Sequence, residues 1–182
     1  MPCYPPKLFI VARMTKNPSL EVGRVLPAVG NFSVKEADAI LEVAYLTTAA
    51  DGRLSEEEYE SFRDVASKLR AMAAGSTSAV SDAALNKLFE RYAVRLENAE
   101  RSERIKALCA DLQREEARDL AYKVSYAMSL CDLEKSEEEE ELDEELIVAL
   151  GLTGDKADTL AGEVYAALDE ELDTDSEEGG TS

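Results

Sequence analysis

The sequence predicts an all-α fold of roughly seven helices, built as a bundle around two repeated helical hairpins. Apolar residues recur at intervals of three and four along most of the chain, which is the spacing of one helix face. No stretch alternates apolar and polar residues over the length of a strand. Ser-x-x-Glu, the capping-box pattern in which both side chains bond free backbone N–H groups, opens three of the helices. These boxes begin at Ser33, Ser55 and Ser136.

The chain divides into three regions. Residues 1–32 contain all five prolines, which interrupt regular helices, so we expect a proline-containing N-terminal arm with little order beyond a short helix around residues 20–26. Residues 33–170 form the helical domain. Residues 171–182 are acidic and poor in apolar side chains, and this composition predicts a disordered tail.

The periodic apolar positions place seven helices in the domain. The first follows Ser33, and the second ends at Gly75, a residue type that suits the left-handed position after a helix. We expect the helices at about residues 34–50, 56–74, 81–96, 99–112, 114–131, 136–150 and 155–170.

The composition excludes several classes of function. The formal net charge is −19, and such a surface repels the phosphates of nucleic acids and anionic lipids while attracting cations and basic proteins. Part of this charge serves solubility alone. The chain has no histidine, which excludes histidine bases and histidine-ligated zinc. Its three cysteines have no paired spacing, and no apolar run is long enough to span a membrane. A cytoplasmic location without membrane insertion is the expectation.

An acidic turn and its following helix start occur twice, 81 positions apart. Asp51, Ser55 and the glutamates at 56–58 correspond to Asp132, Ser136 and the glutamates at 137–139. Each copy therefore reads as an apolar helix, an acidic turn and a capped acidic helix. Two such hairpins can pack their apolar faces into a four-helix core, with the remaining helices around it.

Two known metal-binding motifs do not match this pattern. An EF-hand loop ending at Glu58 would need carboxylates at Thr47 and Ala49, and the second copy has Leu133 where the loop needs glycine. A ferritin-like di-iron bundle needs Glu-x-x-His pairs, which a chain without histidine cannot supply.

The pattern resembles the signature of the tellurite-resistance TerB family and its TerB-like relatives. The first copy carries it nearly in full, as Ala50-Asp51-Gly52-Arg53-Leu54-Ser55-Glu56-Glu57-Glu58. The second copy keeps Asp132 and Glu138-Glu139, and Leu150-Gly151-Leu152 resembles the family's typical ending. The resemblance covers roughly residues 33–168. It implies an all-α fold, a role in tellurite and general stress resistance, divalent-cation binding, and protein partners that include membrane-bound ones.

Six carboxylates of the two turns are the candidate metal ligands, because hard oxygen donors suit Ca²⁺, Mg²⁺ and Mn²⁺. An ordinary explanation competes with this one, since acids in a first helical turn also stabilise the helix dipole and complete the caps. The candidates are Asp51, Glu57, Glu58, Asp132, Glu138 and Glu139.

Three functions remain open from the sequence. The leading one is a non-enzymatic TerB-like stress-response module that binds a divalent cation or a partner through its acidic turns. The first alternative is a metal-free helical adaptor for a basic protein surface. The second is a metal-assisted hydrolase, which is disfavoured because no nucleophile or phosphate loop accompanies the acids, and Arg53 and Lys135 are the only basic residues of the two turns. We therefore expect no catalytic residues.

Overall fold

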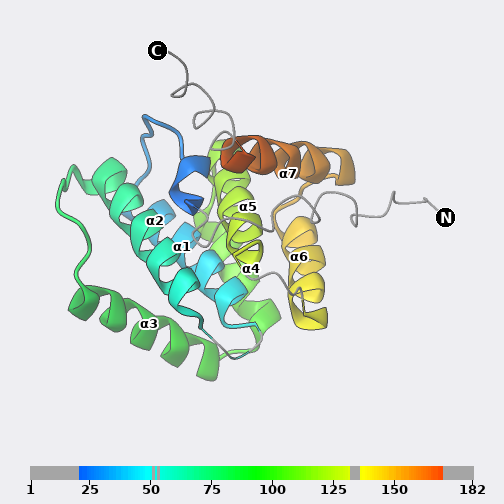
Figure 1. The fold of residues 1–182 in the computed structure, drawn as a ribbon. Coiled ribbons are helices and arrows are strands. Elements are labelled where there is room, and N and C mark those ends of the chain that lie inside the picture. Colours follow the sequence, from blue (N-terminus) through cyan, green and yellow to red (C-terminus); the bar gives the residue numbers. More distant parts are fainter. Residues whose placement is uncertain (1–20, 51, 53, 132–135, 170–182) are drawn as a thin grey trace, which may run out of the picture.

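The computed structural model describes residues 21–50, 52, 54–131 and 136–169, and these contain seven α-helices and one short 3₁₀ helix (Figure 1). No strand occurs in these residues, so the predicted all-α fold is confirmed. The elements are η3 Val22–Val25, α1 Val34–Thr48, α2 Glu56–Ala74, α3 Asp82–Glu97, α4 Arg101–Asp111, α5 Glu115–Ser129, α6 Glu137–Ala149 and α7 Gly154–Asp169.

Helices α1 and α5 form the centre of the molecule and pack along each other. Eleven of the 15 residues of α1 and ten of the 15 residues of α5 are buried. The apolar periodicity explains this, because both helices carry apolar or small residues over a broad face.

Two polar contacts fix how these central helices run. Near their beginnings, Arg114 Nε donates to Glu36 Oε1 at 2.8 Å. Further along, the hydroxyls of Thr47 and Ser125 lie 2.6 Å apart inside the core. Both contacts join residues 78 positions apart. Since the offset is constant, α1 and α5 run in the same direction.

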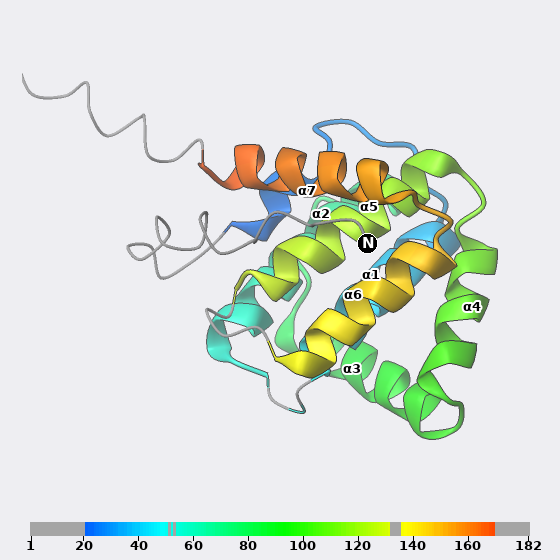
Figure 2. The ribbon, with the colours of Figure 1, turned by 90° about the vertical axis from the view of Figure 1, so that its right-hand side faces the viewer.

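The structure keeps the repeat that the sequence indicates. Both ends of α5 lie 81 positions beyond the corresponding ends of α1. The serine caps of α2 and α6 are also 81 positions apart. The second copy differs in length, because α6 stops at Ala149 and the chain turns at Gly151, which has a φ of 69°. Figure 2 shows α6 and α5 side by side in the second hairpin.

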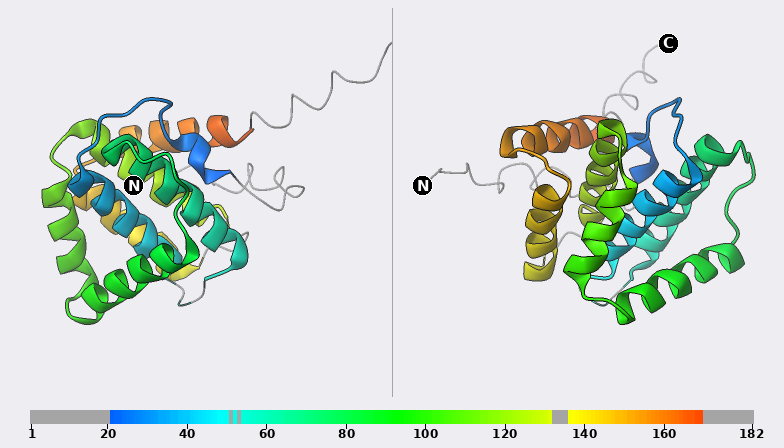
Figure 3. Two further views of the ribbon diagram at one scale, coloured as in Figure 1. Left: turned by 90° about the vertical axis from the view of Figure 1, so that its left-hand side faces the viewer. Right: turned by 180° about the vertical axis from the view of Figure 1, so that it is seen from behind.

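The other elements cover this core from several sides. Helix α3 contacts α1 and α4, whereas α7 contacts α5 and η3, and α3 and α7 lie at opposite edges of the molecule (Figure 3). The 3₁₀ helix η3 also packs against α2 and α5. None of the helices described here combines the length and apolar composition needed to cross a bilayer.

Residues 21–32 contribute to the core, although the sequence pattern places them in the N-terminal arm. Val22 is fully buried and Phe32 is 7% exposed. At Gly23 η3 lies close to α2, because a Cβ at this position would lie 1.9 Å from Asp64 Oδ2, the end of a partly exposed side chain. The short helix expected around residues 20–26 is therefore present as η3. Residues 1–20 and the predicted disordered tail at 171–182 lie outside the described residues.

Candidate functional site

The beginning of α2 is closed by a complete capping box. Ser55 Oγ accepts from the Glu58 N–H at 3.1 Å, and Glu58 Oε2 accepts from the Ser55 N–H at 2.7 Å. Two of the N–H groups that a helix start leaves without partners are thereby bonded. Glu58 is only 5% exposed, so its carboxylate is a buried structural part of the helix start.

The beginning of α6 repeats this geometry. Ser136 Oγ accepts from the Glu139 N–H at 3.2 Å, and Glu139 Oε2 accepts from the Ser136 N–H at 3.0 Å. Glu139 is 8% exposed. The capping role that the sequence predicts for Glu58 and Glu139 is therefore confirmed.

Both capped helix starts lie at the same end of the molecule. Because α1 and α5 run in the same direction, the chain leaves both of them at one end, and α2 and α6 begin there. In Figure 1 this is the lower end, away from α7. We call the first turns of α2 and α6, Glu56–Glu58 and Glu137–Glu139, the acidic pole.

The six candidate ligands have three different positions. Asp51 and Asp132 lie outside the described residues. Glu58 and Glu139 are the buried capping residues described above. Glu57 and Glu138 have exposed side chains, and no ion pair joins either to another residue that the structure describes. Within the described part of the chain, no three acidic or cysteine side chains are grouped as metal ligands. Glu57 and Glu138 are thus the described candidates whose carboxylates face solvent.

Buried hydroxyl groups lie along the last turns of α1 and α5, on the side of the acidic pole. Besides the Thr47–Ser125 contact, Thr48 Oγ1 donates to Tyr45 O at 3.0 Å and Ser129 Oγ donates to Tyr126 O at 2.8 Å. Neither helix has a basic residue in its last turn. The carbonyl ends of both helices therefore add negative potential at the pole.

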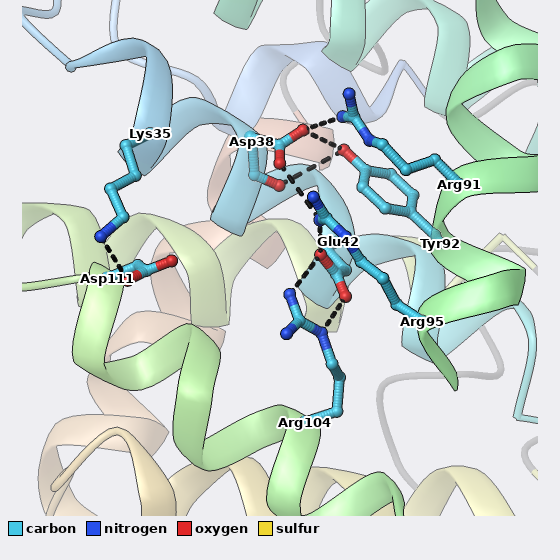
Figure 4. Close-up of polar contacts among 8 residues, drawn as sticks. All are labelled: Lys35, Asp38, Glu42, Arg91, Tyr92, Arg95, Arg104 and Asp111. Carbon is cyan, nitrogen blue, oxygen red and sulfur yellow. Dashed lines mark hydrogen bonds and ion pairs between the residues drawn. The ribbon is translucent and has the colours of Figure 1, made fainter. Parts of the chain in front are cut away.

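A second charged cluster, which the sequence pattern does not single out, joins α1, α3 and α4 (Figure 4). Glu42 is 1% exposed and accepts hydrogen bonds from Arg95 Nη1 at 2.5 Å and from Arg104 Nη2 at 2.9 Å. One turn earlier, Asp38 pairs with Arg91 and Arg95 and accepts from Tyr92 OH at 2.9 Å. We call this set the Asp38–Glu42 cluster.

A signal for this cluster is present in the sequence. Asp38 and Glu42 are four positions apart in a helix whose neighbouring residues are almost all apolar, and Arg91 and Arg95 show the same spacing in α3. Residues four apart share one helix face. Opposite charges at equal spacing on two helices indicate a pairing, but the sequence does not state which helices meet.

The tyrosines in equivalent positions of the two copies have structural partners. Tyr45 packs against Phe89 and Tyr92, with each pair of ring centroids 5.5 Å apart. Tyr126 packs edge-on against Tyr165, and their hydroxyls are 3.2 Å apart. Burial raises the pKa of both Tyr45 and Tyr126, so these phenols stay protonated at neutral pH.

Comparisons of this chain with protein-family models, with curated proteins and with solved structures give no match. The resemblance to the TerB family consequently depends on the residues of the repeated motif themselves. What the fold adds is the geometry of that motif, namely two capped helix starts at one end of a helical domain.

Proposed function

We propose that this chain is a cytoplasmic, non-enzymatic module of the tellurite-resistance and stress-response type, and that its acidic pole binds a divalent cation. The observation that supports this most is the common direction of α1 and α5, which brings two acidic helix starts to one end of the molecule. Carboxylates gathered in this way repel each other, and a bound cation relieves that repulsion.

The cation would be Ca²⁺, Mg²⁺ or Mn²⁺, because every candidate ligand is a carboxylate. Glu57 and Glu138 offer exposed oxygens on the two helix starts. Asp51 and Asp132 each precede a capping serine by four positions in the sequence, and we include them in the ligand set. Glu58 and Glu139 shape the site, since each holds the backbone of its own helix start. Partners would be proteins, including membrane-bound members of the same stress system.

Thermal unfolding followed by circular dichroism tests the cation. CaCl₂, MgCl₂ and MnCl₂ are each added separately at millimolar concentration and constant ionic strength. We expect the cation that binds to raise the Tm of the wild-type chain. Asp51→Asn combined with Asp132→Asn should abolish the rise. The matched control is Asp155→Asn with Asp158→Asn, which removes two exposed charges from α7 at the far end.

If the wild type and both double variants show equal Tm shifts, the cations act only by screening the net charge of −19. The absence of a shift with any of the three cations, together with no heat in titration calorimetry, would exclude the cation site. The acidic pole would then fit the alternative function, a metal-free adaptor that binds a basic protein surface.

A further inference from the structure

Helix α3 has the smallest buried fraction of the helices in the described residues. Of its 16 residues only Leu85 and Tyr92 are buried, whereas most of α1 and α5 is buried. Figures 1 and 3 show it along one edge of the molecule. Its start is held by exposed contacts to α2, where Arg63 pairs with Asp82 at 2.9 Å and Tyr59 OH lies 3.4 Å from Asn86 Oδ1. An element with so little buried surface belongs to the least stable part of a domain.

Besides the buried Leu85, a matched set of charged and aromatic side chains attaches α3 to α1. Arg91 and Arg95 of α3 reach Asp38 of α1, and Arg95 also reaches Glu42 (Figure 4). Tyr92 lies between the two arginines in the sequence, and both guanidinium groups lie over its ring, at 5.2 and 5.8 Å from the centroid.

An aromatic contact completes the attachment. The Phe89 ring of α3 meets the rings of three residues on the helices beneath it. Its centroid lies 5.5 Å from that of Tyr45, 5.9 Å from that of Tyr59 and 4.9 Å from that of Phe62.

This face of α1 and α2 therefore selects a particular kind of helix. It presents two carboxylates one turn apart, which bind two arginines four positions apart, and beside them an aromatic surface that accepts a phenyl ring. Amphipathic helices are commonly recognised in this way, by side chains spaced one turn apart along a groove. Helix α3 meets these requirements and is already covalently present at high effective concentration.

We propose that the face of α1 and α2 under α3 is a helix-binding site, with α3 as its built-in occupant. A partner protein would displace α3 with a helix that carries two arginines four positions apart and an aromatic residue next to them. The first hinge of this opening is residue 81, because Val80 before it is buried and its N–H donates to Ser67 Oγ at 2.9 Å. The second is residues 98–100, which join α3 to α4. This site borders the acidic pole, because Tyr59 follows Glu58 on α2, but its contacts to α3 involve no cation.

A peptide-binding experiment on the full chain tests the proposal. The probe is a fluorescent synthetic peptide with the sequence of residues 80–99, and fluorescence anisotropy measures its binding. The Arg95→Ser chain has a weakened α3, so we expect it to bind the peptide at least tenfold more tightly than the wild-type chain does. A control peptide in which Arg91 and Arg95 are both glutamate should bind neither chain.

Hydrogen exchange of the wild-type chain gives a second readout that needs no variant. Amides of α3 should exchange through a local opening, faster than those of α1 and α5, and added peptide should leave α1 and α5 protected. If the two peptides bind equally, or neither binds, the proposal is wrong. It is also wrong if the amides of α3 exchange only together with those of α1.

Discussion

Replacement of Glu42 by glutamine tests whether the Asp38–Glu42 cluster holds the domain together. The substitution keeps the size of the side chain but removes a charge that is 1% exposed and bonded to guanidinium groups from two other helices. Removing one partner of a buried ion pair typically costs about 3–5 kcal/mol. We expect the lower end of this range, because Arg95 and Arg104 are 35% and 21% exposed and Arg95 keeps its pairing with Asp38. Domains are usually stable by only about 5–15 kcal/mol, so the expected loss is a large part of the total.

Chemical unfolding in urea, followed by circular dichroism at 222 nm, measures this loss directly. A thermal scan gives the same loss as a shift in Tm. For a chain of this size each kcal/mol of unfolding free energy corresponds to about 2–4 °C, so the Tm should fall by about 10 °C. The control is Glu141→Gln, which removes the same charge from a side chain that is 74% exposed and 4.0 Å from Arg101. Exposed pairs contribute about 0–1 kcal/mol.

A Glu42→Gln chain within 1 kcal/mol of the wild type would refute the reasoning. It would mean that the arginines around Glu42 find solvent or another carboxylate at little cost. The cluster would then be an exchangeable surface network in spite of its burial.

Three further predictions concern the helix ends. The hydrogen bond from Arg114 lowers the pKa of Glu36 from 4.5 to about 2. This carboxylate therefore stabilises the fold above pH 4.5 and loses that contribution as the pH falls toward about 2. The difference in unfolding free energy between wild type and Glu36→Gln, measured by urea titration, should vanish over this interval. Ser55→Ala and Ser136→Ala should each lower the free energy of unfolding by about 1 kcal/mol, because each removes one N-cap; a loss at only one of them would contradict the equivalence of the two copies. Gly23→Ala should lower the Tm and loosen η3, since its new Cβ would overlap Asp64, and an unchanged Tm would show that Asp64 moves aside freely.

The sequence was a good guide to the helices, because their signals are local. Ser33, Ser55 and Ser136 all cap helices as the pattern predicts, and Gly75 adopts the expected left-handed conformation with a φ of 65°. Apolar spacing of three and four residues also identified most of the core. These features depend on residues within one turn of each other, so a single sequence contains the information.

Features that depend on distant residues were less accessible. Val22 and Phe32 join the core only because η3 meets α2 and α5, and proline content in this region suggested an arm instead. Glu42 is another example, since its burial depends on arginines more than 50 positions away. The acidic pole was predictable because it repeats in sequence, although only the packing of α1 on α5 brings its two halves to the same end of the molecule.

The two copies of the hairpin are not related by a simple rotation. Corresponding residues are 81 positions apart in the sequence, whereas residues that touch across α1 and α5 are 78 apart. The difference of three residues is a slide of about 4.5 Å along the helix axis, which makes the relation a screw. An ion shared by both halves would be bound by ligands at two different heights along the helix axes. Its coordination would therefore be asymmetric although the sequence motif is doubled.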